Sequence, residues 1–357
     1  MTRSRSEISI ASAGAGKTTT LVKKVLDRDE RAAVTTYTIN NVNAISKRLT
    51  ESAGSIPSKA TLSPWFSFLL RDLIRPYQNY FTTNRITGIN FIQGRSAPRT
   101  KKGTHQHYLD KHNRVYTDKL ASLALHLIKL SGGRVLERLA QLYSRIYIDE
   151  AQDIAGPGLD LIETLMKSEV PIHLVGDTRQ VTYSTNNAAK NSGFRGSKVL
   201  QKYRSWEKAG LCKIHFINES YRCCQAICNT ADSLFPDHER TISRNTKVTG
   251  HDGVFVIPPS QVHSYLDQYP SQALRFDRRT RCDIPSPLNF GASKGLEFGR
   301  VIIFPNGPIR KWLESGDPGS VSAMVSRAKL YVALTRARHS VAFVHGGKCG
   351  HSSFFNL

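Results

Sequence analysis

Ten residues near the start of the chain have the composition of a phosphate-binding loop. They read Ala-Ser-Ala-Gly-Ala-Gly-Lys-Thr-Thr-Thr at positions 11–20. Small side chains let backbone N–H groups surround a polyphosphate, and the N-terminus of a following helix favours its negative charge. A lysine here can reach the β and γ phosphates, and the next hydroxyl can bind Mg²⁺. We therefore expect nucleotide contacts from Ala11, Ser12, Ala13, Gly14, Ala15, Gly16, Lys17, Thr18 and Thr19, and a magnesium ligand in Thr18.

The flanking residues support this interpretation. The apolar run Ile8-Ser9-Ile10 precedes the loop, and Leu21, Val22 and Val25 follow it at helical spacing. A phosphate loop requires this order of strand, loop and helix. The alternative is a glycine-rich turn with a chance lysine. Even a true phosphate loop leaves kinases, GTPases, transporters and helicases open.

Two adjacent carboxylates follow a second apolar strand, expected at 144–148. Asp149 could hold Mg²⁺ and Glu150 could accept a proton from an attacking water, if both lie at the carboxyl edge of a parallel sheet. An acidic turn without a catalytic role is the alternative. A further strand at 172–175 leads to Gln180, which could contact the γ phosphate.

The charge balance points to a polyanionic partner. The 357 residues include 50 Lys and Arg against 28 Asp and Glu, a formal charge of +22. Nucleic acid is the default partner for such a chain, and a membrane surface is the competing one. One basic segment could contact a phosphate backbone or form only a solvated loop; its members are Arg95, Arg99, Lys101, Lys102, His105, His107, Lys111, His112 and Arg114. The first residues hold no apolar signal core, so we expect a cytoplasmic protein.

Alternating strand and helix patterns predict an α/β fold with two domains, at 1–205 and 206–357, and an insertion at about 76–141 in the first. We expect a helix at 61–74, and strands of the second domain at 213–217, 254–257, 273–276, 301–304 and 341–344. Helices are expected at 225–234 and 325–334. Cys223, Cys224 and Cys228 indicate free thiols rather than a structural metal site, because no second CxxC or histidine pair accompanies them.

Seven segments in order resemble the motifs of superfamily 1 helicases of the UvrD/Rep type. They are Ala-Ser-Ala-Gly-Ala-Gly-Lys-Thr (11–18), Thr-Tyr-Thr-Ile-Asn (36–40), Tyr-Ile-Asp-Glu-Ala-Gln-Asp (147–153), Val-Gly-Asp-Thr-Arg-Gln (175–180), Glu-Ser-Tyr-Arg (219–222), Ala-Ser-Lys-Gly-Leu-Glu-Phe (292–298) and Leu-Tyr-Val-Ala-Leu-Thr-Arg-Ala-Arg (330–338).

The resemblance implies two RecA-like domains with parallel sheets that use ATP and Mg²⁺ and bind single-stranded DNA. It assigns Asp149 to the metal and Glu150 to water activation. Gln180, Arg222 and Arg336 would meet the γ phosphate, and Glu297 the nucleotide sugar. The DNA contacts would come from Tyr37, Thr38, Asn40, Tyr183, Asn289 and Lys294. Without the resemblance, Tyr37 is more simply a core residue.

The chain also departs from the family pattern. Only ten residues precede Ala11, which leaves no room for the family's adenine-recognising glutamine, so the base preference is open. Thr185 replaces a stacking tryptophan, and Asn289 and Gly291 replace a threonine and a histidine. The short first-domain insertion and the missing large second-domain insertion resemble reduced helicase components of antiphage systems, such as the Gabija-type subunit that accompanies an OLD-type nuclease.

The leading hypothesis is a DNA-dependent NTPase that translocates on or senses single-stranded DNA, as one subunit of a nuclease complex or alone. A nucleotide-gated DNA sensor or scaffold that does not unwind duplex is the main alternative. A nucleotide kinase would share the phosphate loop but would give no role to Arg222, Lys294 or Arg336.

Overall fold

The computed structural model describes residues 6–92, 94–182 and 189–356. The chain divides into two compact units. The first comprises Met1–Ile10, Lys17–Thr178 and Tyr183–Phe216, and the second comprises Ala11–Gly16, Arg179–Thr182 and Ile217–Leu357. The main division thus falls at 216/217, whereas the sequence led us to expect it at 205/206. The difference arises because the strand at 212–217 joins the sheet of the first unit.

A six-stranded sheet forms the centre of the first unit. Its order is β3-β2-β6-β7-β1-β8, and the first five of these strands run parallel. The strands are β1 (Ser6–Ala11), β2 (Ala32–Thr36), β3 (Ala60–Pro64), β6 (Arg145–Ile148), β7 (Ile172–Gly176) and β8 (Cys212–Ile217). The prediction that 213–217 belongs to the second domain's sheet is therefore wrong, since which strand pairs with which is not a local property of the sequence.

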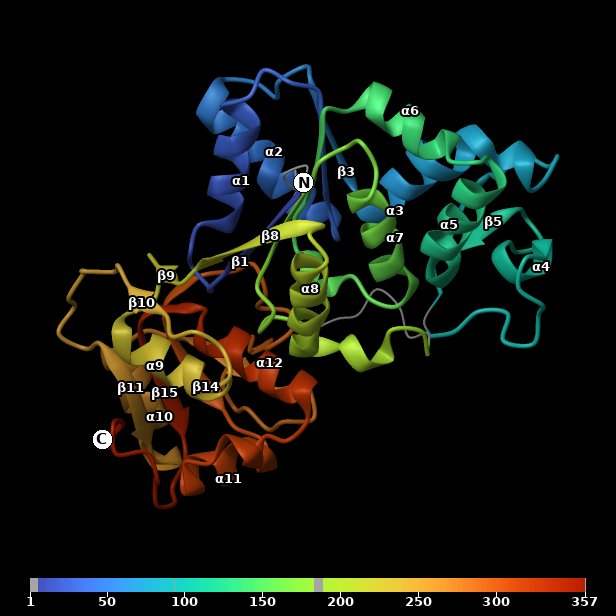
Figure 1. The fold of residues 1–357 in the computed structure, drawn as a ribbon. Helices are drawn as coiled ribbons and strands as arrows, with labels where there is room; N and C mark the ends of the chain where they lie inside the picture. The colour runs from blue at the N-terminus through green and yellow to red at the C-terminus, as the bar shows by residue number, and fades with distance from the viewer. Residues whose placement is uncertain (1–5, 93, 183–188, 357) are drawn as a thin grey trace. The chain divides into compact units, whose positions relative to one another are not determined.

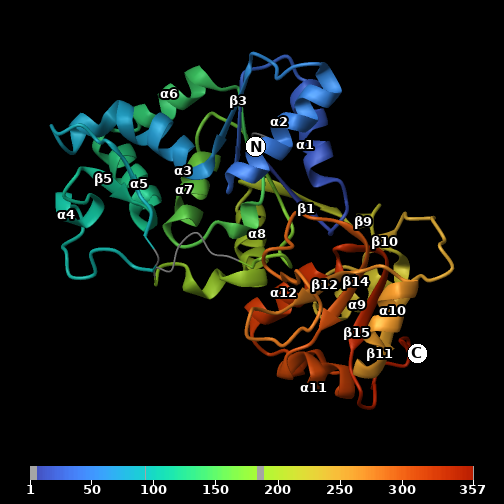
Figure 2. The same cartoon turned by 180° about the vertical axis from the view of Figure 1, so that it is seen from behind.

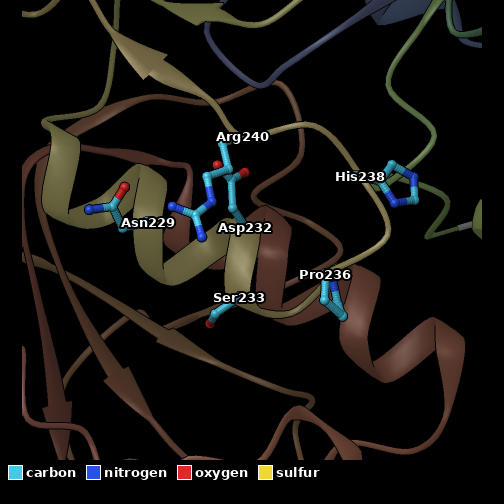
Figure 3. Close-up of a pocket in the computed structure, with 6 residues that line it drawn as sticks. All are labelled: Asn229, Asp232, Ser233, Pro236, His238 and Arg240. Carbon is cyan, nitrogen blue, oxygen red and sulfur yellow. The ribbon is translucent and has the colours of Figure 1, made fainter.

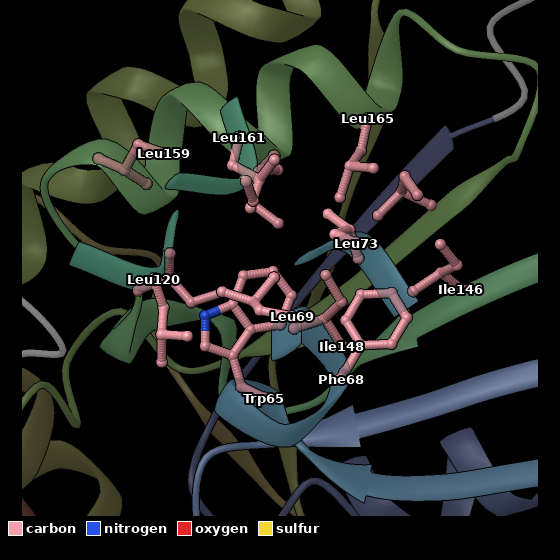
Figure 4. Close-up of a cluster of buried hydrophobic side chains, with 14 of the residues drawn as sticks. Trp65, Phe68, Leu69, Leu73, Leu120, Ile146, Ile148, Leu159, Leu161 and Leu165 are labelled. Carbon is pink, nitrogen blue, oxygen red and sulfur yellow. The ribbon is translucent and has the colours of Figure 1, made fainter. Parts of the chain in front are cut away.

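Helices cover both faces of this sheet (Figure 1). The helices α1 (Lys17–Leu26) and α2 (Ile39–Ala53) pack on one face, against Val34, Tyr147 and Val175. The other face carries α3 (Trp65–Phe68), α5 (Leu120–Leu130), α7 (Pro157–Met166) and α8 (Val199–Lys208). Figure 4 shows part of the resulting core, which includes Trp65, Phe68 and Leu120 together with Ile146 and Ile148 of β6. Alternate residues of β6 thus serve opposite faces.

The segment 61–74 corrects one expectation. It is not a single helix, because Ala60–Pro64 pairs with β2 as strand β3. Helix α3 follows, and Leu69–Ile74 continues as a π-helical turn. The run of aromatic and leucine residues gave a helical pattern, but a short buried strand has the same composition.

The insertion predicted at about 76–141 holds small elements and two longer helices. Strands β4 (Gly88–Asn90) and β5 (Arg114–Tyr116) pair in parallel, and α4 (His105–Tyr108) lies between them in the chain. Helices α5 and α6 (Arg134–Leu142) then return to β6. Leu123 and Leu127 of α5 are fully buried in the core of the unit.

The second unit has its own parallel sheet, of order β13-β12-β14-β15-β11-β16. Its strands are β11 (Gly253–Ile257), β12 (Gln272–Arg275), β13 (Leu288–Asn289), β14 (Phe298–Phe304), β15 (Ala337–Val344) and β16 (Phe355–Asn356). Strands β9 (Glu219–Ser220) and β10 (Ile242–Ser243) pair separately. The strands predicted at 254–257, 273–276, 301–304 and 341–344 are confirmed as β11, β12, β14 and β15, with shifted ends.

Helices lie on both faces of this second sheet, and Figures 1 and 2 label them from opposite sides. Val254 and Val256 face the core that α9 (Gln225–Ser233), α11 (Gly307–Ser315) and α12 (Met324–Leu334) cover. Phe255 and Ile257 face α10 (Val262–Gln268) on the other side. Both units are therefore α/β layers around a parallel sheet, as predicted for RecA-like domains. Among the described residues, the helices are too short and too polar to cross a membrane.

Candidate functional site

The phosphate-loop sequence lies between β1 and α1, in the predicted order of strand, loop and helix. Gly14 and Gly16 both have positive φ angles, of 79° and 72°. A Cβ atom at Gly14 would lie 2.6 Å from the Ser220 hydroxyl, so this position has no room for a side chain. The Ser220 hydroxyl donates to the carbonyl of Ala13 at 2.8 Å, and the Tyr221 N–H donates to the carbonyl of Gly14 at 3.0 Å. The contacts with Ser220 and Tyr221 therefore hold the backbone of the loop in one conformation.

Lys17 and Thr18 open α1, where the helix leaves its first N–H groups directed at the preceding loop. Both are half-buried, and Thr19 is exposed and accepts a hydrogen bond from Arg48. Thr18 and Asp149 belong to the same unit and offer a hydroxyl and a carboxylate oxygen. This donor chemistry fits Mg²⁺, which prefers hard oxygen ligands.

Asp149 and Glu150 follow β6 directly, as the sequence predicted. Asp149 is buried, with an exposed fraction of 5%, and its N–H donates to the carbonyl of Thr35 at 2.8 Å. Glu150 has φ 54°, in the left-handed region that costs a residue with a side chain about 1 kcal/mol or more. Such strain is found most often at functional sites, because the surrounding structure must hold it.

Gln152 fixes the Glu150 side chain. Its amide Nε2 donates to Glu150 Oε2, and its Oε1 accepts from the Asp177 N–H at 3.1 Å. A Cβ atom at Gly176 would lie 2.2 Å from that same Oε1. Because Gly176 has no side chain, the Gln152 amide has space to bond both the Asp177 N–H after β7 and the Glu150 carboxylate after β6. Sequence reasoning missed this role, although both residues lie inside quoted motifs.

The strand order explains why these groups gather. Strands β6, β7 and β1 are consecutive neighbours in a parallel sheet, so their carboxyl ends lie at one edge. Asp149 follows the first, Asp177 the second and the phosphate loop the third. Ligands of open α/β sheets bind outside this edge.

A buried polar cluster supports β1, β7 and α1 from within the same unit. His173 Nε2 lies 3.0 Å from the Ser9 hydroxyl, and its Nδ1 lies 3.1 Å from the Glu7 carboxylate. Lys24 of α1 donates to Glu7 at 3.0 Å. Burial, with the charge of Lys24, lowers the pKa of His173 to about 4, against the opposing charge of Glu7. The imidazole is thus neutral near pH 7.

In the second unit, two candidate cations make contacts within the protein. The Lys294 ammonium donates to the backbone carbonyl of Gln180 at 3.3 Å. The Arg222 guanidinium donates to Glu297 at 2.7 Å and to the carbonyl of Thr335 at 3.1 Å. Burial alone would raise the pKa of Glu297, but its hydrogen bonds and ion pairs with Arg222 and Arg338 hold that pKa below the usual value. The Glu297 carboxylate thereby orients Arg222.

Arg336 is more deeply placed than its predicted role suggested. Its exposed fraction is 2%, and it donates to the carbonyls of Val332 and Leu296, both at 3.0 Å. It also donates to the Thr335 hydroxyl at 3.3 Å. These bonds connect the end of α12 to the segment before β14, so the side chain has a structural function in addition to any catalytic one.

Arg179 is a second buried arginine, and it lies in the quoted motif at 175–180 although no role was predicted for it. It donates to Asp232 of α9 at 2.8 Å and to the Ser12 hydroxyl at 2.8 Å. Its guanidinium carbon lies 4.8 Å from the centre of the Tyr331 ring. The Thr241 hydroxyl donates to Asp232 at 2.9 Å and lies 3.1 Å from the Ser12 hydroxyl. These residues, all counted in the second unit, join the phosphate loop and the loop after β7 to α9.

The predicted nucleic-acid contacts have mixed surroundings. Tyr37 is half-buried, with its ring 5.7 Å from that of Phe66. The Thr38 hydroxyl caps α2 by accepting from the Asn41 N–H at 3.1 Å. Asn40 is exposed in the first turn of that helix. In the second unit, Asn289 accepts from Arg275 at 3.3 Å. Tyr183 and Thr185 lie outside the described residues.

The basic segment of the insertion is only partly a free surface. His107 is buried and lies 3.0 Å from the Thr100 hydroxyl, and Arg114 is paired with Asp110 at 2.8 Å. Six members of the segment are exposed: Arg95, Arg99, Lys101, Lys102, Lys111 and His112. These six, rather than the whole segment, remain available for a phosphate backbone.

A cavity of about 410 Å³ opens beside α9 (Figure 3). Its lining comes from α9, through Asn229, Asp232 and Ser233, and from the following loop, through Pro236, His238 and Arg240. It contains no residue that the sequence assigned to nucleotide, metal or DNA.

The thiols of Cys223 and Cys224 lie within hydrogen-bonding distance of backbone carbonyls. The described part of the chain holds no group of three His, Cys, Asp or Glu residues suited to a metal.

The comparison with family models finds one match. Residues 71–195 match the UvrD/REP helicase N-terminal domain. This segment begins after the phosphate loop and includes Asp149, Glu150 and Gln180. It covers about a third of the chain and indicates a helicase-like protein. None of the curated proteins compared with the chain matches it.

Solved helicase structures align with most of this chain at low sequence identity. An arterivirus nonstructural protein 10 (helicase) in complex with DNA is 14% identical with a TM-score of 0.50, and the match covers 96% of this chain and 61% of that one. The same helicase in another crystal structure is 13% identical, with a TM-score of 0.49 and 96% and 60% covered. A PRRSV helicase is 15% identical, with a TM-score of 0.46 and 96% and 52% covered. The chain thus corresponds to between half and two thirds of the length of these helicases, and at this identity the similarity concerns the fold alone.

Proposed function

We propose that this chain is an NTP-hydrolysing motor of the helicase type that binds single-stranded nucleic acid. The observation that carries the proposal is the edge of the first sheet, where β1, β7 and β6 end in the phosphate loop, Asp177 and the Asp149–Glu150 pair. The link from Gln152 to Glu150 gives this edge a positioned base. The resemblance of residues 71–195 to a helicase domain and the charge of +22 support a nucleic-acid substrate.

In the proposed reaction, water attacks the γ phosphate and yields a nucleoside diphosphate and phosphate. Lys17 and the loop N–H groups hold the β and γ phosphates. The Glu150 carboxylate, oriented by Gln152, accepts the proton of the attacking water. Arg222 and Arg336 are the cations assigned to the negative charge that grows on the transferred group. Mg²⁺, held by Thr18 and Asp149, would neutralise phosphate charge when bound.

The finer assignments are part of the proposal and are each open to test. ATP is the expected nucleotide and single-stranded DNA the expected track, and the helicase of similar fold was solved with DNA. None of the relatives named above comes from an antiphage system or is paired with an OLD-type nuclease. The proposal therefore does not depend on such a partner.

The experiment is hydrolysis of ATP, GTP, CTP and UTP by the purified chain, with and without single-stranded DNA or RNA. We expect hydrolysis that nucleic acid stimulates. Absence of hydrolysis under all conditions would refute the proposal. Strand displacement on a 3′-tailed duplex then separates a motor that unwinds from a nucleotide-gated sensor or scaffold, which would hydrolyse NTP without separating the strands.

A further inference from the structure

Phe91 is an exposed aromatic residue that no motif assigns. It directly follows β4 in the insertion, and its exposed fraction is 73%. Its ring centre lies 6.4 Å from that of Phe66, at an interplanar angle of 67°. Phe66 supports the Phe91 ring from one side, so a flat aromatic face remains open to solvent.

The ring belongs to a row that begins at the sheet edge. Tyr37 and Phe66 follow the carboxyl ends of β2 and β3, which are paired neighbours. Their ring centres lie 5.7 Å apart, at an angle of 73°. Tyr37, Phe66 and Phe91 thus form a continuous edge-to-face row, which we call the aromatic row. It runs from the candidate DNA contact at Tyr37 to the insertion.

The insertion holds Phe91 in place on both sides. The Thr117 hydroxyl donates to the carbonyl of Asn90, the residue before Phe91, at 2.7 Å. Farther along, Ser96 donates its N–H to Asp118 at 3.1 Å. The backbone beside Phe91 is thus anchored, so less conformational freedom is lost when a ligand stacks on the ring.

The sequence on either side of Phe91 is rich in cations. Residues 73–109 contain six Lys or Arg and no Asp or Glu; the six are Arg75, Arg85, Arg95, Arg99, Lys101 and Lys102. All six are exposed. Asp110 and Asp118 fold back onto this segment, and each is bonded within it: Asp110 to Asn90 and Arg114, Asp118 to Ser96 and Lys119. An exposed aromatic face beside exposed cations suits a polyanion that also has flat apolar groups. A purely apolar protein segment would use the ring but not the cations, and a duplex has no open base face.

We propose that Phe91 is a stacking site for an unpaired base of a single-stranded nucleic acid, with the adjacent phosphates near Arg95 and Arg99. The inference rests on the proposed function, because it presupposes that the chain binds single strands. It adds a residue of the insertion to the binding surface, where the motifs assign Tyr37, Thr38, Asn40 and Tyr183 in this unit.

The test is the fluorescence anisotropy of labelled oligothymidylate and oligouridylate with the full chain. We expect Phe91→Ala to raise the dissociation constant about 5- to 150-fold, the range that loss of one base stack produces. Phe91→Tyr should bind like the wild type, since it keeps the ring. Phe91→Leu should behave like Phe91→Ala, since it keeps only apolar volume. Phe355→Ala, which removes an exposed phenylalanine of the second unit, is the matched control and should leave the affinity unchanged.

The salt dependence separates stacking from charge. Arg99→Gln should reduce the slope of log affinity against log salt by about 0.7 if it loses one phosphate contact, whereas Phe91→Ala should leave the slope unchanged. Loss of affinity with either oligonucleotide supports the inference and identifies the strand. Wild-type affinity in Phe91→Ala or Phe91→Leu would overturn it. If the wild type binds neither oligonucleotide, the proposed function fails as well, so the two failures are distinguishable.

Discussion

Arg179 and Asp232 form a buried ion pair of 2.8 Å, with side-chain exposures of only 5% and 11%. The pair connects the loop after β7 to α9, and its arginine also donates to Ser12 of the phosphate loop. Arg179 also donates to the Thr241 hydroxyl at 3.4 Å. A buried arginine with three acceptors is satisfied only while all of them stay in place. The pair therefore makes the conformation of the phosphate loop depend on α9.

Removing one partner of the Arg179–Asp232 pair should destabilise the fold. We expect Asp232→Ala to lower the free energy of unfolding by about 3 kcal/mol or more, because the Arg179 charge stays buried without its carboxylate. The double variant Arg179→Met with Asp232→Leu should lose less than the sum of the single variants. Urea denaturation measures both. Glu51→Ala, which breaks the exposed Lys47–Glu51 pair, is the control and should cost within about 1 kcal/mol. If the double variant lost as much unfolding free energy as the two single variants together, the coupling between Arg179 and Asp232 would be contradicted.

Gly176 should affect catalysis through the space that it leaves for Gln152, not through its backbone conformation. A Cβ atom there would collide with Gln152 Oε1, so Gly176→Ala should displace Gln152 and leave Glu150 misplaced. We expect kcat for NTP hydrolysis to fall on the order of 10²-fold, with nucleotide affinity nearly unchanged. Steady-state kinetics and nucleotide titration provide the measurement. Gly88→Ala is the matched control, because nothing lies within 4 Å of a Cβ at Gly88. Equal kcat in both variants would show that Gln152 does not position Glu150.

Arg222 should act on turnover more than on binding. Arg222→Gln removes a guanidinium assigned to the charge that develops on the γ phosphate, so kcat should fall about 10²-fold or more. Nucleotide affinity should change much less. Arg244→Gln breaks a comparable arginine–glutamate contact, to Glu219, and should leave kcat unchanged. A parallel fall in kcat and affinity for Arg222→Gln would assign it to ground-state binding.

His173 predicts a pH dependence of stability. Its pKa is lowered to about 4 in the fold, against about 6.5 in an unfolded chain. The unfolded state therefore binds more protons between these values, and stability falls as the pH drops through this window. The loss attributable to His173 is on the order of 3 kcal/mol between about pH 6.5 and pH 4. Denaturation across this range should show a weaker dependence of stability on pH in His173→Gln than in the control His263→Gln, which changes an exposed histidine of the second unit. Equal slopes would contradict this origin.

The sequence could predict the groups that are encoded locally. The phosphate loop, the Asp149–Glu150 pair and the loop at Gln180 each follow a short apolar strand, and the structure places them after β1, β6 and β7. Their residue types and the strand before them are enough to predict such positions. The α/β class and most strands of the second unit were predictable for the same reason.

Contacts between distant parts of the chain were not predictable. Arg179 and Asp232 are 53 positions apart, and nothing in either local pattern selects the other. The strand β8 was assigned to the wrong sheet because its apolar pattern does not specify its neighbour. The segment 61–74 was predicted as a helix because aromatic and leucine residues suit both a short buried strand and a helix. In all three examples the structure is determined by contacts with residues distant in the sequence.

The central claim is that Glu150 activates water at a phosphate loop. Its most direct test compares Glu150→Gln with the wild type for NTP hydrolysis and for binding of a fluorescent nucleotide. The exposed Glu169→Gln serves as the matched control. The account predicts at least about a 10²-fold loss of hydrolysis in Glu150→Gln with nucleotide binding retained. Wild-type hydrolysis by Glu150→Gln would contradict it.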